Sequence, residues 1–183
     1  ISRLMSDVEM LHHEYLQPHI SPLVRTSIVI DIDSELDVEA LKNSDIPFPA
    51  TIVGRARSGK LVSEPHGSDR PHLRWNLSIP VNFPKFGMKN KKSLKSYTRQ
   101  KWVYDQIRNE LIRKLKLLGL KVDTNDPCLT KNPLHDDWHV IEGDTRTCGM
   151  SELKKALNFE YEIKKPTRSN RSEYKEKPAA VKF

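Results

Sequence analysis

The stretch that most constrains the fold is Thr26-Ser27-Ile28-Val29-Ile30-Asp31-Ile32-Asp33. Its β-branched residues favour an extended chain, and the run is short and apolar enough to predict a buried strand. Side chains alternate between the two faces of a strand, so Asp31 and Asp33 project from the same face. The stretch therefore predicts a core strand that ends in a pair of acids.

This acidic pair is a candidate metal site. Two carboxylates on one face repel each other unless a cation lies between them or a proton returns. Mg²⁺ or Mn²⁺ relieves this repulsion and can bridge to substrate phosphates, and two-metal phosphoryl transfer uses acids in this way. The alternative is an exposed strand end whose acids cap the following helix. The pair alone is equally compatible with both interpretations.

Outward from this strand, the sequence predicts strands and helices without strict alternation. A helical stripe covers Leu4–Leu16, and a short helix covers Glu35–Leu41. Further strands are predicted at Ala50–Val53 and at His72–Val81, with a loop or hairpin over Gly54–Arg70 between them. The second of these strands has one apolar face, formed by Leu73, Trp75, Leu77 and Ile79.

The clearest helix is predicted over Ser93–Leu118, with Gly119 as its C-terminal stop. Its apolar stripe consists of Val103, Ile107, Leu111, Leu115 and Leu118. A last strand is predicted over Trp138–Glu142, and a short helix over Ser151–Leu157 with Ser151 as its N-cap. Such a mixture favours an α+β fold.

Length and composition predict one compact domain over residues 1–163, followed by a polar tail or linker over 164–183. Lysine and arginine number 31 against 24 acids, a net charge of +7 that favours polyanionic partners. No apolar run is long enough to cross a bilayer, and the start does not have the form of a signal peptide. Two cysteines cannot form a disulfide scaffold, so a cytoplasmic protein is expected.

Other residues could take part in chemistry. His72 lies between Arg70 and Arg74 at alternate positions, an arrangement that could present three donors to a triphosphate. Either Asp123 or Asp126 could supply a third metal-holding carboxylate if the segment after the long helix returns beside the first strand. A zinc quartet is not predicted, because the spacings of its possible ligands are irregular: Cys128, His135, His139 and Cys148.

A dense basic run precedes and begins the long helix, with aromatic residues interspersed. The basic positions are Lys85, Lys89, Lys91, Lys92, Lys95, Arg99 and Lys101, and the aromatic ones are Phe83, Phe86, Tyr97 and Trp102. Basic groups can follow a phosphate backbone while aromatic rings stack on exposed bases. The run modestly favours nucleic-acid contact over a solvated helix face.

In this order the pieces resemble the archaeo-eukaryotic primase superfamily, in its plasmid and phage replicase branch of colicin-plasmid-type replication initiators. The resemblance spans residues 25–160. Its most specific element is the Lys-Asn-Pro-x-His-x-x-Trp pattern, which here is Lys131-Asn132-Pro133-Leu134-His135-Asp136-Asp137-Trp138. It also includes Asp31 and Asp33, the stretch from His72 to Leu77, Asp123, and the short helix at Met150–Leu153.

The resemblance implies an RNA-recognition-like (RRM-like) catalytic sheet backed by a smaller α/β unit, in a bacterial protein encoded by a plasmid or phage. It implies primer synthesis from ribo- or deoxyribonucleoside triphosphates on a single-stranded DNA template, with Mg²⁺ or Mn²⁺. Asp31, Asp33 and Asp123 would hold the metals, with Asp126 competing as the third acid. His72, Arg70, Arg74 and Lys131 would bind the nucleotide. A C-terminal origin-binding domain is expected in the full-length chain.

Two other functions remain open from the sequence. A rolling-circle nickase would use Tyr97 or Tyr104 as its nucleophile, although that chemistry requires a His-x-His pair and Arg74 stands where the second histidine belongs. A non-catalytic nucleic-acid-binding module would show salt-dependent binding without any metal requirement.

Overall fold

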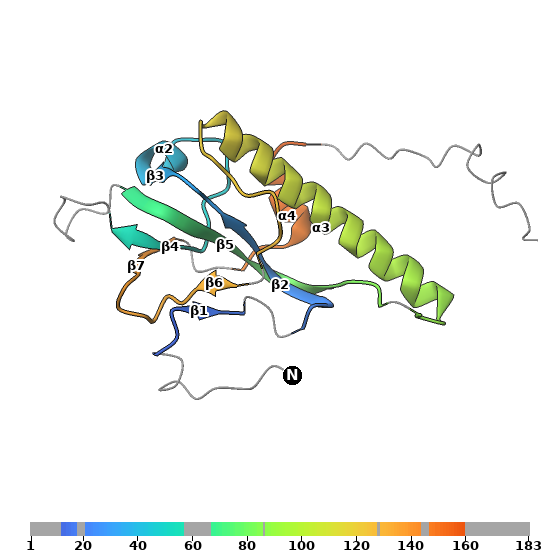
Figure 1. The fold of residues 1–183 in the computed structure, drawn as a ribbon. Helices are drawn as coiled ribbons and strands as arrows, with labels where there is room; N and C mark the ends of the chain where they lie inside the picture. Colours follow the sequence, from blue (N-terminus) through green and yellow to red (C-terminus); the bar gives the residue numbers. More distant parts are fainter. Residues whose placement is uncertain are drawn as a thin grey trace, which may run out of the picture.

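The computed structural model describes residues 12–17, 21–56, 67–85, 87–127, 129–143 and 147–159. Their strands are β1 (Tyr15–Leu16), β2 (Val24–Asp31), β3 (Glu35–Asp37), β4 (Thr51–Ala56), β5 (Gly67–Asn82), β6 (Thr130–Lys131) and β7 (His139–Glu142). The helices are α2 (Val38–Lys42), α3 (Lys91–Leu117) and α4 (Met150–Ala156). Together they form an α+β fold in which the long helix α3 runs diagonally across an antiparallel sheet (Figure 1).

The main sheet has the strand order β2-β5-β4-β7, and β3 pairs with the first residues of β5. β5 is the long central strand, and its His72 lies opposite Asp31 on one side and Val53 on the other. On the free edge of β2, the segment after α3 adds a single antiparallel bridge between Ile32 and Val122. This bridge brings the segment containing Asp123 beside the acidic end of β2.

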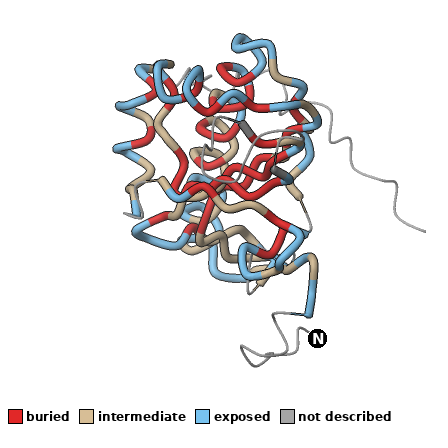
Figure 2. The backbone as a smooth tube through the Cα atoms, turned by 90° about the vertical axis from the view of Figure 1, so that its left-hand side faces the viewer, coloured by how far each residue is buried: buried red, intermediate tan, exposed pale blue. Residues whose placement is uncertain are grey.

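The face of the sheet toward α3 is the apolar core. Ile28, Ile30 and Ile32 project from alternate positions of β2 and are completely buried. The other strands and α3 complete the same cluster with Leu73, Trp75, Ile52, Tyr104, Ile107, Leu111 and Leu115. Figure 2 shows these buried segments gathered in the middle of the molecule. Removal of this apolar surface from water is the main stabilisation of the fold.

The opposite face of the sheet carries Asp31 and His72. It is crossed by the chain between α3 and β7, which includes β6 and contributes Thr130 and Lys131 against His72. β6 pairs with β1 in a separate two-stranded sheet, with Tyr15 opposite Lys131. The polar residues of this face are therefore partly covered by a layer in which the described residues form strands and loops but no helix.

The strand that contains Asp31, the strand at His72, the long helix and the last strand are confirmed. Gly119 ends the helix with φ of 82°, the left-handed conformation that suits glycine. The residues 57–66, the tail from residue 160 and most of the predicted Leu4–Leu16 helix lie outside the described residues. No helix among the described residues has both the length and the apolar character needed to span a bilayer.

The structure corrects two predicted helix segments. Tyr15 and Leu16 form β1 and not the end of a helix, because they pair with Lys131 and Thr130. The segment Glu35–Asp37 is also a strand, since it pairs with Gly67–Asp69. The helix begins only at Val38, where the Asp37 carboxylate accepts hydrogen bonds from the backbone N–H groups of Glu39 and Ala40.

Three predicted side-chain positions were also wrong. Ile79 is 75% exposed, because β5 is irregular between its pairing with Ser27 and its pairing with Arg25. Leu118 is 41% exposed, because α3 ends one residue before it. The N-cap of α4 is Gly149 and not Ser151, and the Gly149 N–H donates to the Glu152 carboxylate at 2.6 Å.

Candidate functional site

Asp31 and His72 form the centre of the polar face. They are directly opposite each other on β2 and β5, and the distance from Asp31 Oδ1 to His72 Nε2 is 3.1 Å. His72 is only 5% exposed, whereas the Asp31 side chain is 29% exposed. The histidine therefore lies beneath the carboxylate, and the carboxylate faces the solvent.

The hydrogen bonds to His72 place the ring proton. The backbone N–H of Lys131 donates to Nδ1 at 3.2 Å, and the Thr130 hydroxyl lies 3.2 Å from the same nitrogen. Because Nδ1 accepts a hydrogen bond, the ring proton is on Nε2 and is donated to Asp31. Both ring nitrogens therefore make hydrogen bonds within the protein. The bond from Nε2 orients the Asp31 carboxylate.

Asp31 is held in its ionised form. Burial alone would raise the pKa of this carboxyl, but the hydrogen bond from His72 and the positive charge of Lys131 together outweigh burial. The net effect is a pKa below the ordinary value. An ionised carboxylate that still reaches solvent is a suitable ligand for a hard cation.

Asp33 and Asp123 are brought to the same edge as Asp31 by the backbone. The Asp123 N–H donates to the Asp31 carbonyl at 3.0 Å, and the Asp33 N–H donates to the Lys121 carbonyl at 2.8 Å. This antiparallel register places all three acids on the face opposite the buried Ile32 and Val122. The Asp123 carboxylate also accepts the Asn125 N–H at 2.9 Å. Within the described residues, however, no three acidic, histidine or cysteine side chains converge closely enough to form a ready metal site.

The competing acid, Asp126, has a different environment. Its Oδ2 accepts hydrogen bonds from Arg25 Nε at 3.1 Å and from Arg25 Nη2 at 2.9 Å. The guanidinium of Arg108 lies 3.8 Å from its other oxygen. The Asp126 carboxylate thus pairs with two arginines and holds the segment after α3 against β2 and α3. Because Asp126 is engaged in these ion pairs, the geometry favours Asp123 as the third acid.

A polar cavity of about 300 Å³ is lined in part by Lys131, whose backbone N–H donates to His72 and whose charge helps to lower the pKa of Asp31. The cavity is lined by Tyr15, Arg55, Asp69, Arg70, Lys131 and Trp138. Its wall therefore contains three cationic side chains and one acidic side chain. Burial lowers the pKa of Lys131, although the nearby charge of Asp31 acts in the opposite direction. The cavity has the size of a small-ligand site and the charge to receive an anion.

The predicted arginines occupy different positions around this cavity. Arg70 lines it and has φ of 45°, a left-handed conformation that residues with a Cβ rarely adopt. Its N–H donates to the Ser34 carbonyl, and its own carbonyl accepts from Lys131 Nζ at 2.6 Å. Arg74 is half-buried two residues beyond His72, where burial lowers its pKa and its Nε has no hydrogen-bond partner in the part of the chain described.

The Lys-Asn-Pro-x-His-x-x-Trp pattern joins this site to β1. Lys131 reaches the cavity, whereas the buried Asn132 donates from Nδ2 to the His13 carbonyl at 2.8 Å. Trp138 donates from Nε1 to the Glu14 carbonyl at 2.9 Å, and its ring is contacted by the cations of Arg55 and Lys131. Lys131 and Trp138 of the pattern thus line the cavity, and the hydrogen bonds of Asn132 and Trp138 hold this wall to the residues just before β1.

Sequence reasoning missed Arg55, Tyr15 and Thr130 as members of this site. Arg55 follows a break in the β4–β5 register between Val53 and Arg55, so simple alternation along the strand could not place its side chain. A Cβ at the intervening Gly54 would come within 2.2 Å of the Ser68 side chain and 2.9 Å of the Asp69 carbonyl. Glycine at this position was the available signal of an irregular strand.

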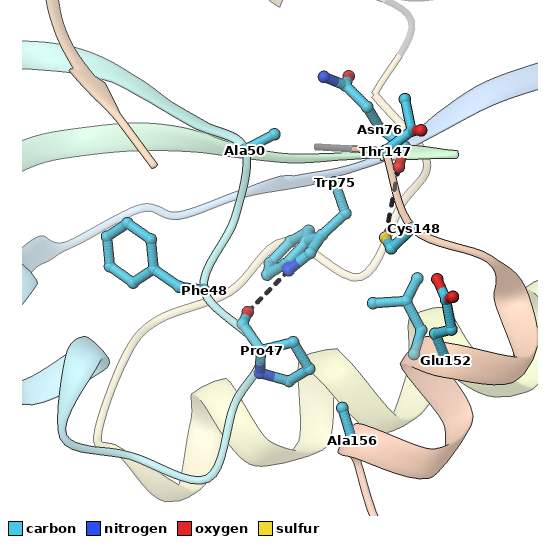
Figure 3. A pocket seen from close by; sticks show the side chains of 10 residues that line it. Pro47, Phe48, Ala50, Trp75, Asn76, Thr147, Cys148, Glu152 and Ala156 are labelled. Atoms are coloured by element: carbon cyan, nitrogen blue, oxygen red, sulfur yellow. Dashed lines mark hydrogen bonds between the residues drawn. The ribbon is translucent and has the colours of Figure 1, made fainter. Parts of the chain in front are cut away.

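A second cavity, of about 170 Å³, lies between β5 and α4 (Figure 3). Apolar side chains line most of it, and the Trp75 indole donates to the Pro47 carbonyl at 2.8 Å beside it. The acid at its rim, Glu152, already accepts the hydrogen bond from Gly149. This cavity therefore lacks the cluster of cationic side chains that lines the first cavity.

Comparison with known protein families identifies the chain. Residues 2–157, which include every site residue described above, match the model of the Replicase family. The chain belongs to this family. Comparisons with curated proteins and with solved structures gave no significant match. Membership of the Replicase family confirms the resemblance to replicases and makes the chain an enzyme of DNA replication.

The structure argues against Tyr104 as a nucleophile in this Replicase family member. Tyr104 is 1% exposed in the core, and its hydroxyl donates to the Ser27 carbonyl at 3.3 Å. Burial and the neighbouring Asp126 raise the pKa of the phenol, which opposes formation of the phenolate. The helix that carries it packs on the face of the sheet opposite Asp31.

We expect Tyr104→Phe to keep the activity of the replicase and to lose about 0.5–1.5 kcal/mol of unfolding free energy, because the Ser27 carbonyl loses its buried donor. Urea unfolding and a nucleotide-incorporation assay on the same preparation would measure the two effects. A covalent adduct between wild-type protein and single-stranded DNA that disappears in Tyr104→Phe would instead support the nickase function.

Proposed function

We propose that this chain is a template-directed nucleotidyltransferase that synthesises primers from nucleoside triphosphates on single-stranded DNA. The observation that carries the proposal is the register at the end of β2, which puts Asp31, Asp33 and Asp123 on one face. The cationic cavity of Arg55, Arg70 and Lys131 is connected to this face through Lys131, whose N–H donates to His72. Acids for metal ions and cations for a triphosphate are the two components of phosphoryl transfer.

The sheet topology supports the same class. The elements β2, α2, β4, β5, α3 and the Val122 segment follow one another in the β-α-β-β-α-β order of ferredoxin-like and RRM-like folds. The last member, reduced here to a bridge at Val122, pairs with the first strand at its acidic end. In this arrangement, the face opposite α3 is only partly covered by β1 and β6, and its exposed part, which includes the Asp31 carboxylate, could receive substrate.

The donor set fits Mg²⁺ or Mn²⁺. All three acids provide carboxylate oxygens, which are the ligands these ions prefer, and Asp31 is anionic. Divalent ions held by Asp31, Asp33 and Asp123 would activate the attacking 3′-hydroxyl and neutralise the charge that develops on the phosphates. Because the three side chains do not converge in the described residues, this fit requires Asp33 and Asp123 to turn toward Asp31 when ions bind.

The remaining residues act through charge and position. Lys131, Arg55 and Arg70 would bind the phosphates of the incoming nucleotide, since their cations line one cavity. Arg74 has an unsatisfied Nε on the same face as His72 and would supply a further donor. His72 is a positioning residue, because its Nε2 proton is donated to Asp31.

The direct test is unprimed synthesis. We expect the protein, given single-stranded DNA, labelled nucleoside triphosphates and Mn²⁺ or Mg²⁺, to make short oligomers that are absent when EDTA is added. Gel electrophoresis of parallel reactions with ribo- and deoxyribonucleotides would also give the substrate preference. A primed template in a third reaction tests elongation independently of initiation. If neither template gives a metal-dependent product while DNA binding is intact, the non-catalytic binding module is the correct function.

A further inference from the structure

The first half of α3 contributes no fully buried residue to the core. Although the helix runs from Lys91 to Leu117, its buried residues all lie at Tyr104 or beyond. This half, about three turns long, projects past the start of β2 in Figure 1. It is joined to β5 by the Asn82 N–H, which donates to Gln100 Oε1 at 3.0 Å.

The projecting half is strongly cationic. Between Arg70 and Tyr104 the sequence contains eight lysines and arginines and neither aspartate nor glutamate. Four of these cations are exposed on the projecting turns and have no ion-pair partner among the described residues: Lys91, Lys92, Lys95 and Arg99. These four are called the cationic overhang. Lys101, one turn further on, already pairs with Asp105 at 2.5 Å.

The cationic overhang is unfavourable for the isolated helix. Lys91 and Lys92 lie at the helix N-terminus, where the helix dipole disfavours positive charge, and the first turn contains no acid. Lys91, Lys95 and Arg99 are spaced four residues apart, so like charges are neighbours on one face. A polyanion bound along this face would relieve both repulsions.

We propose that the cationic overhang binds the phosphates of the single-stranded DNA template outside the catalytic site. The inference rests on the proposed function, which makes that strand the substrate. The overhang joins the fold beside Arg25 and Phe83, at the opposite end of β2 from Asp31. Asp31 lies six positions along the strand from Arg25, so the two residues are about 20 Å apart. A single-stranded DNA template that passes Asp31 is flexible enough to extend over this distance. It would reach the overhang at a point where it is not yet paired with a product strand.

Contact through phosphates predicts binding without sequence preference. Of the interspersed aromatics, Phe83 packs edge-on against Tyr104 at 5.3 Å, and Arg25 and Lys101 lie over its ring. It therefore does not offer a free stacking surface for a base. Each phosphate neutralised on a single strand contributes about 0.7 to the slope of log affinity against log salt concentration.

The test uses two variants of the full chain with equal loss of charge. One replaces the overhang (Lys91→Gln, Lys92→Gln, Lys95→Gln, Arg99→Gln), and the control replaces four exposed cations elsewhere (Lys42→Gln, Arg113→Gln, Lys116→Gln, Lys155→Gln). Binding to fluorescein-labelled oligothymidylate is measured by anisotropy over a series of NaCl concentrations, without nucleotide or divalent metal. Because no synthesis occurs, the result does not depend on catalysis.

We expect the overhang variant to bind about tenfold or more weakly near 0.15 M salt and to have a salt slope shallower by about 3, with a thermal midpoint no lower than that of wild type. The control should keep most of the affinity. An unchanged slope in the overhang variant, an equal loss in the control, or no binding by wild type would each overturn the inference. A separate assay measures synthesis by the same variants on a primed template. This assay tests the proposed function independently of the binding experiment.

Discussion

Replacing Asp31 with Asn should reduce metal-dependent nucleotide incorporation by at least about a hundredfold. Loss of groups that only support a metal ligand already costs about 10–100-fold in affinity or activity, so loss of a ligand should cost no less. The substitution removes the negative charge but retains an oxygen that can accept the His72 Nε2 proton. The fold should therefore be retained, and single-turnover incorporation on a primed template would measure the chemical step.

Asp136→Asn is a matched control for this experiment. Asp136 is an exposed acid on the segment that crosses the polar face, so its loss changes the net charge equally. Circular dichroism and thermal unfolding of both variants would separate loss of chemistry from loss of folding. Normal incorporation by Asp31→Asn would show that Asp31 is not a metal ligand. Equal losses in both variants would indicate a general effect of charge.

The low pKa of Asp31 also predicts how stability depends on pH. Its folded-state pKa lies below the ordinary value of about 3.9, so ionisation of Asp31 stabilises the fold at every pH above that value. This contribution is lost as the pH falls through the folded-state pKa, and it is absent in Asp31→Asn at any pH. The difference in unfolding free energy between the two proteins should therefore shrink below about pH 4.

The sequence was most informative where local physics decides the structure. The β-branched run before Asp31 predicted a buried strand, and the two-residue spacing of Asp31 and Asp33 predicted that both acids share a face, because side chains alternate along a strand. The long helix was predictable for the same reason, since its apolar stripe is regular. The basic run at its start also predicted nucleic-acid contact, although the sequence did not show that this part of the helix extends beyond the core.

Long-range pairing could not be predicted from local patterns. Glu35–Asp37 has an ordinary helical composition and becomes a strand only because β5 extends back to Gly67. Arg55 enters the cavity because β4 breaks register beside it. The contacts of Lys131 and Thr130 with His72 could not be predicted, because they arise from a segment nearly sixty positions away in the sequence. Tertiary contacts decide such positions.

Asp123→Asn and Asp126→Asn should have opposite effects. Asp123 lies on the acidic face beside Asp31, and an asparagine there can still accept the Asn125 N–H. We therefore expect loss of incorporation by at least about a hundredfold with little change in stability. Asp126→Asn removes the charge that pairs with Arg25 and Arg108. It should lose about 1–3 kcal/mol of unfolding free energy, because two largely buried guanidinium groups lose their counter-ion.

The pair separates a catalytic acid from a structural one. In urea unfolding, Asp126→Asn should shift the midpoint, whereas Asp123→Asn should not. In single-turnover incorporation at a temperature where both variants are folded, the order should reverse. If Asp126→Asn lost incorporation while Asp123→Asn kept it, the third acid would be Asp126, and metal binding would have to break the ion pairs of Arg25 and Arg108. That outcome would require the segment after α3 to move away from β2, which the backbone bond from Asp123 to Asp31 opposes.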